Sequence, residues 1–323
     1  MIEPGWTIDA IKAYIGRLPL WSGEPAISPM AGGLTNLVFL VEDGDTNYVA
    51  RVGFDLPDHD MYDVFIQTAM RAAAEIGVAP AIRYIEPRLA VMDFVPGGTL
   101  RPETASEPKN MERAIGLLRR LHQGTGAVRG PIRYVCYFQH TRGYVALLRR
   151  LESRVIDELP RYDALLDTLE KEISPFTPVL TQNDPLPQNF LGGPEDELKL
   201  VDWDHGGIGH PFNDLSSFLN NADVPLEQWD RAIEICCGEV DDRLRYELSV
   251  FAVVAALREY IWAPVQELVS HVPEEVVAAS MQELHPDLPA GYEGYGIINY
   301  ERFEKILSDH EQKYGKVGGA RQI

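Results

Sequence analysis

Cysteine is scarce in this chain of 323 residues, which holds only Cys136, Cys236 and Cys237. The number is odd and two of the three are adjacent, a pattern that gives neither a disulfide framework nor the spacing of a cysteine metal site. Disulfide-rich folds belong to oxidising compartments. We therefore expect reduced, mostly buried thiols in a cytoplasmic protein.

Positive charge and long apolar runs are also in short supply. Lys and Arg number 29 against 49 Asp and Glu, which gives a net charge of −20. Nucleic acids and anionic membranes select the opposite sign, so neither is an expected partner, whereas a small cation would be attracted. We find no apolar run near the roughly 20 residues that span a bilayer, and no signal-peptide pattern at the N-terminus.

The first 95 residues mix helix and strand patterns. An amphipathic helix ends near Pro19, and a second helix over residues 62–76 ends at Gly77. Five short strand patterns lie around these helices and predict an antiparallel sheet. We therefore expect residues 1–95 to form a small lobe that combines this sheet with a helix.

Beyond the chain-breaking sequence PGG at residues 96–98, the pattern is mainly helical. Apolar residues recur at helical spacing over residues 108–123, 141–157, 161–173, 226–237 and 241–261. The expected fold class is α+β, with a small sheet-containing lobe over residues 1–95 and a larger helical lobe over residues 96–323. A cleft between two such lobes is a natural ligand site.

The loop TQNDPLPQNF, residues 181–190, places Asp184 and Asn189 five residues apart, and Asp202 follows the apolar strand LKLV. An unpaired carboxylate at the end of a buried strand is costly, so it indicates a function. Phosphoryl transfer uses all three residues. Asp184 would orient the acceptor hydroxyl and take its proton, while the oxygens of Asn189 and Asp202 would hold Mg²⁺.

The segments NDPLPQNF and LKLVDWDHGGIGHPFNDLSSF resemble the catalytic segment of the aminoglycoside phosphotransferase and choline/ethanolamine kinase superfamily, most of all its bacterial choline kinase-like branch. The resemblance covers roughly residues 25–305 and is specific at residues 180–220. It implies a bilobal protein-kinase-like fold that transfers the γ-phosphate of ATP to a small-molecule hydroxyl. In that fold the N-terminal lobe binds the nucleotide, and Asp214 matches a structural acid that braces the catalytic loop.

Two positions depart from the family pattern. Gln182 stands where the family has a histidine that braces the loop, and a glutamine side chain can also donate and accept hydrogen bonds. The helix over residues 62–76 has Ile66 and Gln67, with Asp63 one turn earlier, near the position of the glutamate that pairs with the phosphate-binding cation. We therefore expect that cation to be held in a different way.

The nucleotide side of the resemblance lies in the first lobe. The glycine turn Gly32-Gly33, followed by Thr35 and Asn36, resembles the nucleotide loop of choline kinases, and a glycine turn lets backbone N–H groups approach phosphates. Arg51 falls where that family places its phosphate-clamping cation. The resemblance also implies an interlobe connector with backbone bonds to adenine, made by Met92, Asp93, Phe94 and Val95.

The acceptor side of the resemblance lies near the C-terminus. Trp262 and Tyr300 match aromatic positions that enclose a quaternary ammonium, and Tyr292 and Tyr295 are further aromatic residues nearby. Asp204 matches an acid that faces the substrate cation. The resemblance thus implies a small cationic alcohol, choline or ethanolamine, as acceptor, and a monomer or homodimer.

Three alternatives stay open at the level of sequence. The acceptor is an aminoglycoside or another small-molecule hydroxyl, or the chain is a catalytically silent nucleotide-binding homologue. A zinc hydrolase built on His205 and His210 is the most distant alternative, because an oxygen-rich site favours Mg²⁺.

Overall fold

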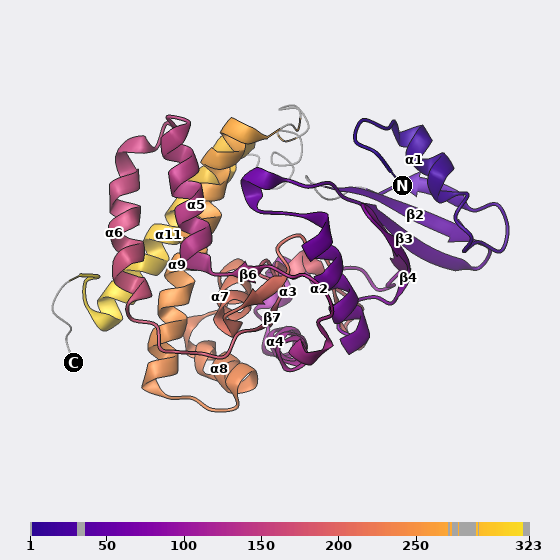
Figure 1. Ribbon diagram of the computed structural model, residues 1–323. Coiled ribbons are helices and arrows are strands. Elements are labelled where there is room, and N and C mark those ends of the chain that lie inside the picture. The colour runs from indigo at the N-terminus through magenta and orange to yellow at the C-terminus, as the bar shows by residue number, and fades with distance from the viewer. Residues whose placement is uncertain are drawn as a thin grey trace. The chain divides into compact units, whose positions relative to one another are not determined.

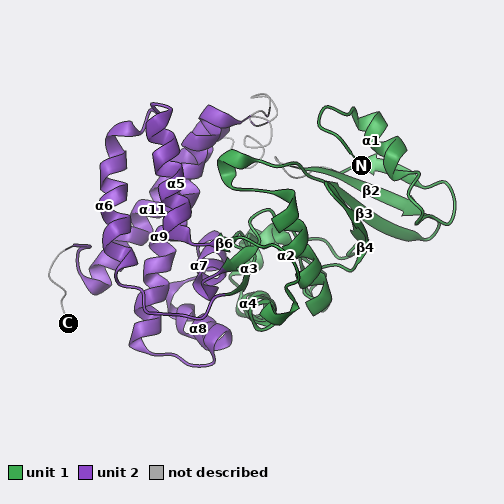
Figure 2. Cartoon of the chain, viewed as in Figure 1, with its two compact units in different colours: residues 1–134, 179–208 green, residues 135–178, 209–323 purple. Residues whose placement is uncertain are grey.

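The computed structural model describes residues 2–30, 36–270, 272, 277, 289 and 291–318. The chain divides into two compact units, the first made of residues 1–134 and 179–208, the second of residues 135–178 and 209–323 (Figure 2). The segment with Asp184 and Asp202 therefore folds with the N-terminal part of the chain. The predicted lobe boundary between residues 95 and 96 stays a prediction.

The first unit contains the predicted five-stranded antiparallel sheet (Figure 1). Its strands are β1 (Ala26–Pro29), β2 (Leu37–Asp43), β3 (Thr46–Val52), β4 (Ile82–Glu86) and β5 (Leu89–Asp93), in the order β1-β2-β3-β5-β4. Phe39 and Val41 alternate along β2 and are buried in one cluster with Ile11 and Ile15 of helix α1 (Ile8–Ile15). The residues that alternate along β2 and those that recur at helical spacing in α1 thus pack in one core.

Helix α2 (Asp63–Ile76) confirms the helix predicted over residues 62–76. It ends at Gly77, whose φ of 78° is the left-handed conformation that glycine adopts without a steric penalty. The carbonyl of Gly77 accepts a hydrogen bond from Lys199 Nζ at 2.6 Å, and Leu200 N donates to the carbonyl of Val78 at 2.7 Å. The end of α2 is therefore fastened to strand β9 (Lys199–Leu200), which pairs with β8 (Phe190–Leu191).

The connector that follows β5 is bonded to this β8–β9 hairpin through the backbone. Leu100 N donates to the carbonyl of Phe190 at 2.8 Å, and Gly192 N donates to the carbonyl of Gly98 at 2.9 Å. Gly97 has a φ of 100°, and a Cβ built there would lie 2.3 Å from the backbone nitrogen of Gly193. Only glycine fits at residue 97, because the two backbones approach too closely for a side chain.

Shorter elements complete the first unit. They are the helices α3 (Pro102–Ala105) and α4 (Pro108–Gln123), the 3-10 turns η1 (Pro57–His59), η2 (Thr125–Ala127) and η4 (Pro187–Asn189), and a small sheet of β6 (Tyr134–Val135), β10 (Gly207–Gly209) and β7 (Val179–Thr181). Helix α4 spans the predicted residues 108–123.

The second unit is helical in the part of the chain that the structure describes. Its elements are α5 (Tyr137–Arg150), η3 (Ile156–Glu158), α6 (Leu159–Glu170), α7 (Pro211–Asn221), η5 (Leu226–Gln228), α8 (Trp229–Cys237), α9 (Asp242–Val269) and α11 (Gly291–Tyr314). Helix α9 packs against α5, α7 and α11. Helices α7 and α11 were not assigned from the sequence.

Two predicted helix boundaries in this unit were wrong. The helix expected over residues 141–157 covers residues 137–150, because the chain leaves the helix near Glu152, which has a φ of 53°. Helix α9, expected to end at residue 261, continues through Pro264 to Val269. Proline removes one helical hydrogen bond, but Val265 and Gln266 beyond it are buried, and this burial offsets the loss.

Helix α9 also corrects our expectation that the chain has no apolar run long enough to span a bilayer. By length and composition it is apolar enough to cross a membrane, with a mean hydropathy of 1.5 over its most apolar window. In the structure 83% of that window is buried against the rest of the protein. The apolar side chains of α9 are thus accounted for by the core of the second unit.

Candidate active site

The loop after β7 holds Asp184 by its backbone. Asn183, just before it, has a φ of 67°, a left-handed conformation that is uncommon outside glycine. The carbonyl of Asp184 accepts hydrogen bonds from Leu186 N at 2.8 Å and from Asn189 Nδ2 at 3.0 Å. The hydrogen bond from Asn189 Nδ2 to the Asp184 carbonyl orients the side-chain oxygen of Asn189 away from that carbonyl. This oxygen remains a possible metal ligand.

Gln182 joins the two loops that carry the predicted acids. Its side-chain oxygen accepts a hydrogen bond from Asp184 N at 2.7 Å, and its side-chain nitrogen donates to the carbonyl of Asp202. The side chain is completely buried. The structure therefore confirms that glutamine at this position makes the donor and acceptor contacts of a bracing residue.

Asp202 follows β9 and has a φ of 61°, so a second non-glycine residue of this site adopts the left-handed conformation. Such strain persists only where the surrounding structure enforces it, and it gathers at functional sites. Solvent reaches the side chain from a pocket, yet the protein around it still desolvates the carboxylate. This desolvation, followed by the nearby charge of Asp204, raises the pKa of Asp202. A cation placed beside Asp202 would relieve both effects.

Arg51 on β3 is paired with Asp204. The guanidinium forms an ion pair with the Asp204 carboxylate, and both side chains are largely buried. Asn36 bridges the two, since it accepts a hydrogen bond from Arg51 at 2.8 Å and donates one to Asp204 at 2.8 Å. In the structure the Asp204 carboxylate is engaged with Arg51 and Asn36, and the expectation that Asp204 faces a substrate cation stays a prediction.

This ion pair gives Arg51 a carboxylate partner that does not lie on α2. Asp63, the nearest acid on that helix, accepts hydrogen bonds from Gln67 Nε2 at 2.9 Å and from Arg88 N at 2.7 Å. The expectation that Arg51 is held in a different way is therefore confirmed. Its counter-charge comes from the loop that also carries Asp202.

A pocket of about 560 Å³ in the first unit collects most of the predicted nucleotide residues. Asn36, Arg51, Asn189 and Asp202 line it, together with the predicted connector residues Met92, Asp93, Phe94 and Val95. Its remaining lining is largely apolar, with Met30, Val38, Val49, Met70, Ile82 and Leu191 among the contributors. This volume lies in the range of small-molecule sites, and the combination of apolar walls with a few polar groups is typical of them.

The backbone of residues 93–95 offers fewer free donors than expected. Asp93 N donates to the carbonyl of Ala81 at 3.0 Å, and Phe94 N donates to the carbonyl of Asn47 at 3.2 Å. Within the described residues, the N–H of Val95 makes no such bond. The side chain of Asp93 forms two hydrogen bonds with Arg83, both 2.6 Å long, so it is directed to that residue.

Not every predicted residue joins this pocket. Gly32, Gly33 and Thr35 lie outside the described residues. Asp184 is bonded to Asn189 but does not itself line the pocket. Trp262 and Tyr300 belong to the second unit, as does Asp214, which is buried on α7. The roles of these residues stay predictions.

A family model described as the phosphotransferase enzyme family matches residues 26–271, about three quarters of the chain. The chain belongs to this family. The curated relatives it matches include two LicA proteins of Haemophilus influenzae, one 23% identical over 230 residues, or 68% of this chain and 65% of the relative. The other match covers 56% of its relative, so the chain spans less than two thirds of either one.

Solved structures place this chain in the protein-kinase-like fold of the choline and ethanolamine kinases. A choline/ethanolamine kinase family protein from Mesorhizobium loti has a TM-score of 0.69 at 23% identity and covers 94% of this chain and 97% of its own. LicA in complex with AMP has a TM-score of 0.66 at 17% identity, with 94% and 98% covered. The predicted α+β fold class is confirmed.

In the second unit, Trp262 contacts the two tyrosines that the sequence analysis named as further aromatic residues nearby. Its ring lies edge-on to Tyr292, with centroids 5.7 Å apart, and to Tyr295, with centroids 5.4 Å apart. The hydroxyl of Tyr295 donates to the carboxylate of Glu259. Tyr300 packs on Tyr260 instead, with centroids 5.0 Å apart. In the sequence, the one indication that Tyr292 and Tyr295 lie near Trp262 was their position close to Tyr300 on the same helix.

The chemistry of the donors argues against zinc. Among the described residues, no group of three or more His, Cys, Asp and Glu side chains is arranged to hold a metal. His210 Nδ1 accepts a hydrogen bond from Phe212 N at 3.0 Å as the cap of α7, and its ring stacks on Phe251. Oxygen donors such as Asn189 and Asp202 suit Mg²⁺, which keeps several waters and substrate oxygens in its coordination sphere.

Proposed function

We propose that this protein transfers the γ-phosphate of ATP to the hydroxyl of a small amino-alcohol, with choline as the best-supported acceptor. The observation that carries the proposal is the single pocket lined by Arg51, Asn189 and Asp202 and otherwise largely apolar. Phosphoryl transfer from a nucleotide requires a cation that binds phosphate, oxygen ligands for a metal ion and an apolar surface for the nucleobase. This pocket offers all three.

The apolar part of the pocket suits the adenine ring. The free N–H of Val95 is the candidate donor to the ring edge, and the phosphates extend toward Arg51. The relative with AMP bound supports a nucleotide in this fold. The guanidinium, already oriented by Asp204 and Asn36, offers its remaining N–H groups to phosphate oxygens.

Asn189 and Asp202 would hold Mg²⁺. Both line the pocket, both present oxygen, and the raised pKa of Asp202 reflects an environment that a divalent cation would stabilise. The ion, when bound, neutralises charge on the transferring phosphoryl group. Asp184, whose backbone is fixed by Asn189 and Gln182, would orient the acceptor hydroxyl and accept its proton.

Trp262, Tyr292 and Tyr295 support a cationic acceptor. Trp262 contacts both tyrosines, and Glu259 is bonded to Tyr295; aromatic rings with a nearby carboxylate are the groups that recognise a quaternary ammonium. The net charge of −20 attracts the same ligand. The name of one similar structure, a choline/ethanolamine kinase family protein, points to the same class.

The test is ADP release with choline, ethanolamine and several aminoglycosides, with and without Mg²⁺. We expect release with an amino-alcohol that requires Mg²⁺, and its loss in Asp184→Asn and Asp202→Asn variants that keep the wild-type circular dichroism. Activity that survives Asp202→Asn would contradict the metal assignment. ATP binding without ADP release for any acceptor would favour a silent nucleotide-binding homologue.

Trp262→Ala separates the acceptor classes. For choline the Michaelis constant should rise about tenfold or more, because a desolvated cation–π contact contributes about 2 kcal/mol. The Michaelis constant for ATP should not change. If choline kinetics are unaffected while an aminoglycoside is the better substrate, the amino-alcohol proposal is wrong.

A further inference from the structure

Gly53 directly follows β3 and lies two residues after Arg51. Successive side chains of a strand point to opposite faces, so a side chain at residue 53 would point to the same face as Arg51. The register of β2 with β3 places Asn36, which precedes β2, beside the same residue. Residue 53 therefore lies next to two polar side chains of the nucleotide pocket.

The backbone conformation of Gly53 does not require glycine. Its φ is not positive, so any L-residue can adopt it. The residue is buried, and its N–H donates to the carbonyl of Arg88 at 3.1 Å. Val52, just before it, pairs with Leu89 of β5. The sheet thus holds the backbone at residue 53, and what distinguishes glycine there is the absence of a side chain.

A side chain at residue 53 would meet the end of the Arg51 side chain. A Cβ built there lies 2.6 Å from Arg51 Nη1, 2.9 Å from Arg51 Nη2 and 2.8 Å from Asn36 Oδ1. Non-bonded contacts between carbon atoms are favourable at about 3.5–4.0 Å. Because the sheet holds the backbone, the guanidinium and the amide would have to move, and both are the ends of side chains that can rotate.

The two terminal nitrogens of Arg51 have different contacts. Nη2 donates to Asn36 Oδ1 at 2.8 Å and to the Asp204 carboxylate. Within the described residues, Nη1 makes no hydrogen bond, so its N–H groups remain for a ligand.

Nη1 is also the atom closest to the position of a Cβ at residue 53. Arg51 lines the 560 Å³ pocket together with Asn189 and Asp202, the candidate metal ligands. A guanidinium presents its N–H groups in a fixed planar fork, so a rotation that relieves the contact at residue 53 redirects all of them. A side chain at residue 53 would therefore move the donors that remain for a phosphate.

We propose that Gly53 is a positioning residue for the phosphates of the nucleotide. Because it has no side chain, the Arg51 guanidinium can lie against residue 53, bonded to Asn36 and Asp204, with Nη1 left to donate to a phosphate oxygen. Alanine at residue 53 would turn the guanidinium out of this orientation without breaking the sheet. This inference rests on the proposed function, because it concerns the same phosphate-binding cation.

The test is isothermal titration calorimetry of the full chain with Mg²⁺ and either ADP or adenosine. In Gly53→Ala we expect Kd for ADP to rise about tenfold, equivalent to about 1.4 kcal/mol, because a charge-assisted hydrogen bond to phosphate is misaligned. Kd for adenosine, which has no phosphate, should stay at the wild-type value. A purely structural role of Gly53 would weaken the binding of both ligands alike.

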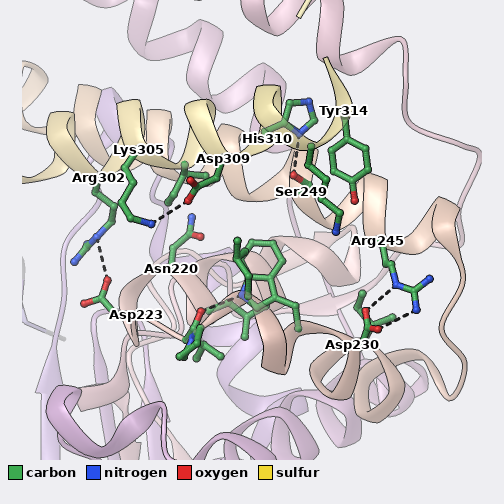
Figure 3. A pocket seen from close by; sticks show the side chains of 18 residues that line it. Asn220, Asp223, Asp230, Arg245, Ser249, Arg302, Lys305, Asp309, His310 and Tyr314 are labelled. Atoms are coloured by element: carbon green, nitrogen blue, oxygen red, sulfur yellow. Dashed lines mark hydrogen bonds and ion pairs between the residues drawn. The ribbon is translucent and has the colours of Figure 1, made fainter. Parts of the chain in front are cut away.

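Arg51→Lys shows whether the effect passes through the guanidinium. Lysine keeps a positive charge beside Asp204 but lacks the two nitrogens that a Cβ at residue 53 would meet. Added to Arg51→Lys, Gly53→Ala should therefore change Kd for ADP by less than about twofold. Arg245→Lys is the control for this exchange and should leave Kd unchanged, since Arg245 pairs with Asp230 beside a cavity of the second unit (Figure 3).

Gly126→Ala is the matched glycine control, because residue 126 has no positive φ and a Cβ there meets nothing within 4 Å. The inference is overturned if Gly53→Ala binds ADP as tightly as the wild type, if it weakens adenosine as much as ADP, or if its effect is undiminished beside Arg51→Lys. Loss of the wild-type circular dichroism in Gly53→Ala also overturns it, since the sheet should survive. Wild-type protein that does not bind ADP contradicts the proposed function itself, and this inference with it.

Discussion

The side chains of Arg51 and Asp204 are only 10% and 7% exposed, so each depends on the other for its charge. Removing one partner of a buried pair leaves an uncompensated charge and typically costs about 3–5 kcal/mol. Asn36 contributes a neutral bridge that fixes the orientation of both. At the scale of single residues, the orientation of Arg51 therefore depends on the loop that carries Asp202.

We predict that Asp204→Asn raises the Michaelis constant for ATP about tenfold and lowers stability, because Arg51 loses its counter-charge. The Michaelis constant for the acceptor should change little. Steady-state kinetics with each substrate varied in turn would separate the two constants. Asp163→Asn, at an exposed ion pair with Arg149, is the control.

The opposite result has a clear meaning. If Asp204→Asn raises the Michaelis constant for the acceptor alone, Asp204 faces the substrate cation, as the sequence led us to expect. The ion pair with Arg51 would then be exchanged for the substrate during the reaction.

The sequence grouped the polar residues of this pocket, whereas it did not identify their ion-pair partners. The placement of Asn36, Arg51, Asn189 and Asp202 in one pocket follows from motifs with fixed spacing on recognisable strands. The pairing of Arg51 with Asp204 joins residues 153 positions apart, and no local pattern encodes such a contact. The available signal that Arg51 needed a distant partner was the presence of Ile66 and Gln67 where the family has a glutamate.

Helix α11 carries a buried histidine whose ionisation opposes folding. Burial lowers the pKa of His310 to about 4, and its Nδ1 lies 2.8 Å from the hydroxyl of Ser249 on α9. The ring is packed beside Tyr246 and Tyr314. An unfolded histidine titrates near pH 6.5, so below that pH the unfolded chain binds a proton that the folded chain excludes.

We predict that this linkage lowers the free energy of unfolding by up to about 3 kcal/mol as the pH falls from 6.5 to 4. His310→Gln should be less stable at pH 7.5 but should show a smaller loss at acid pH. Urea unfolding of both proteins at pH 7.5, 6 and 5 would give the difference. An identical pH dependence in the two proteins would show that His310 is not the group responsible.

The end of α2 provides a second prediction at the scale of elements. Gly77→Ala should lower the free energy of unfolding by about 1 kcal/mol, because a left-handed conformation places the alanine Cβ against the backbone. Gly116→Ala, within α4, is the matched control. A Cβ there meets nothing within 4 Å, so it should stabilise the protein by about 0.5–1 kcal/mol. Two changes of the same sign would refute the conformational explanation.

Helix boundaries were predicted less well than helix positions. The apolar period identified α4 and α9 because their buried faces are continuous. The end of α9 was missed because proline is the strongest local signal for a helix end, and the burial of Val265 overrides it.

At the scale of the whole molecule, the excess of 20 negative charges stands beside many exposed ion pairs. Exposed pairs contribute about 0–1 kcal/mol each, whereas self-repulsion acts on every acid at once. Salt screens both. We predict that repulsion dominates, so the melting temperature rises by a few degrees when the NaCl concentration increases from about 10 mM to about 300 mM, where the Debye length falls below about 8 Å.

Differential scanning calorimetry at several NaCl concentrations would measure this change. Sodium sulfate should not replace NaCl, because excluded salts stabilise proteins by a different route. A melting temperature that falls with NaCl would show that the ion pairs outweigh the repulsion.

The two glycine-rich turns that meet at Gly97 and Gly193 have a mechanical consequence. Because the connector and the β8–β9 hairpin are joined through their main chains, a displacement of residues 96–100 carries Phe190 and its neighbour Asn189 with it. The connector and Asn189, which both line the 560 Å³ pocket, are thus linked through main-chain hydrogen bonds. A side chain introduced at residue 97 would push the connector and the β8–β9 hairpin apart. We expect the resulting displacement at Asn189 rather than at the substituted residue itself.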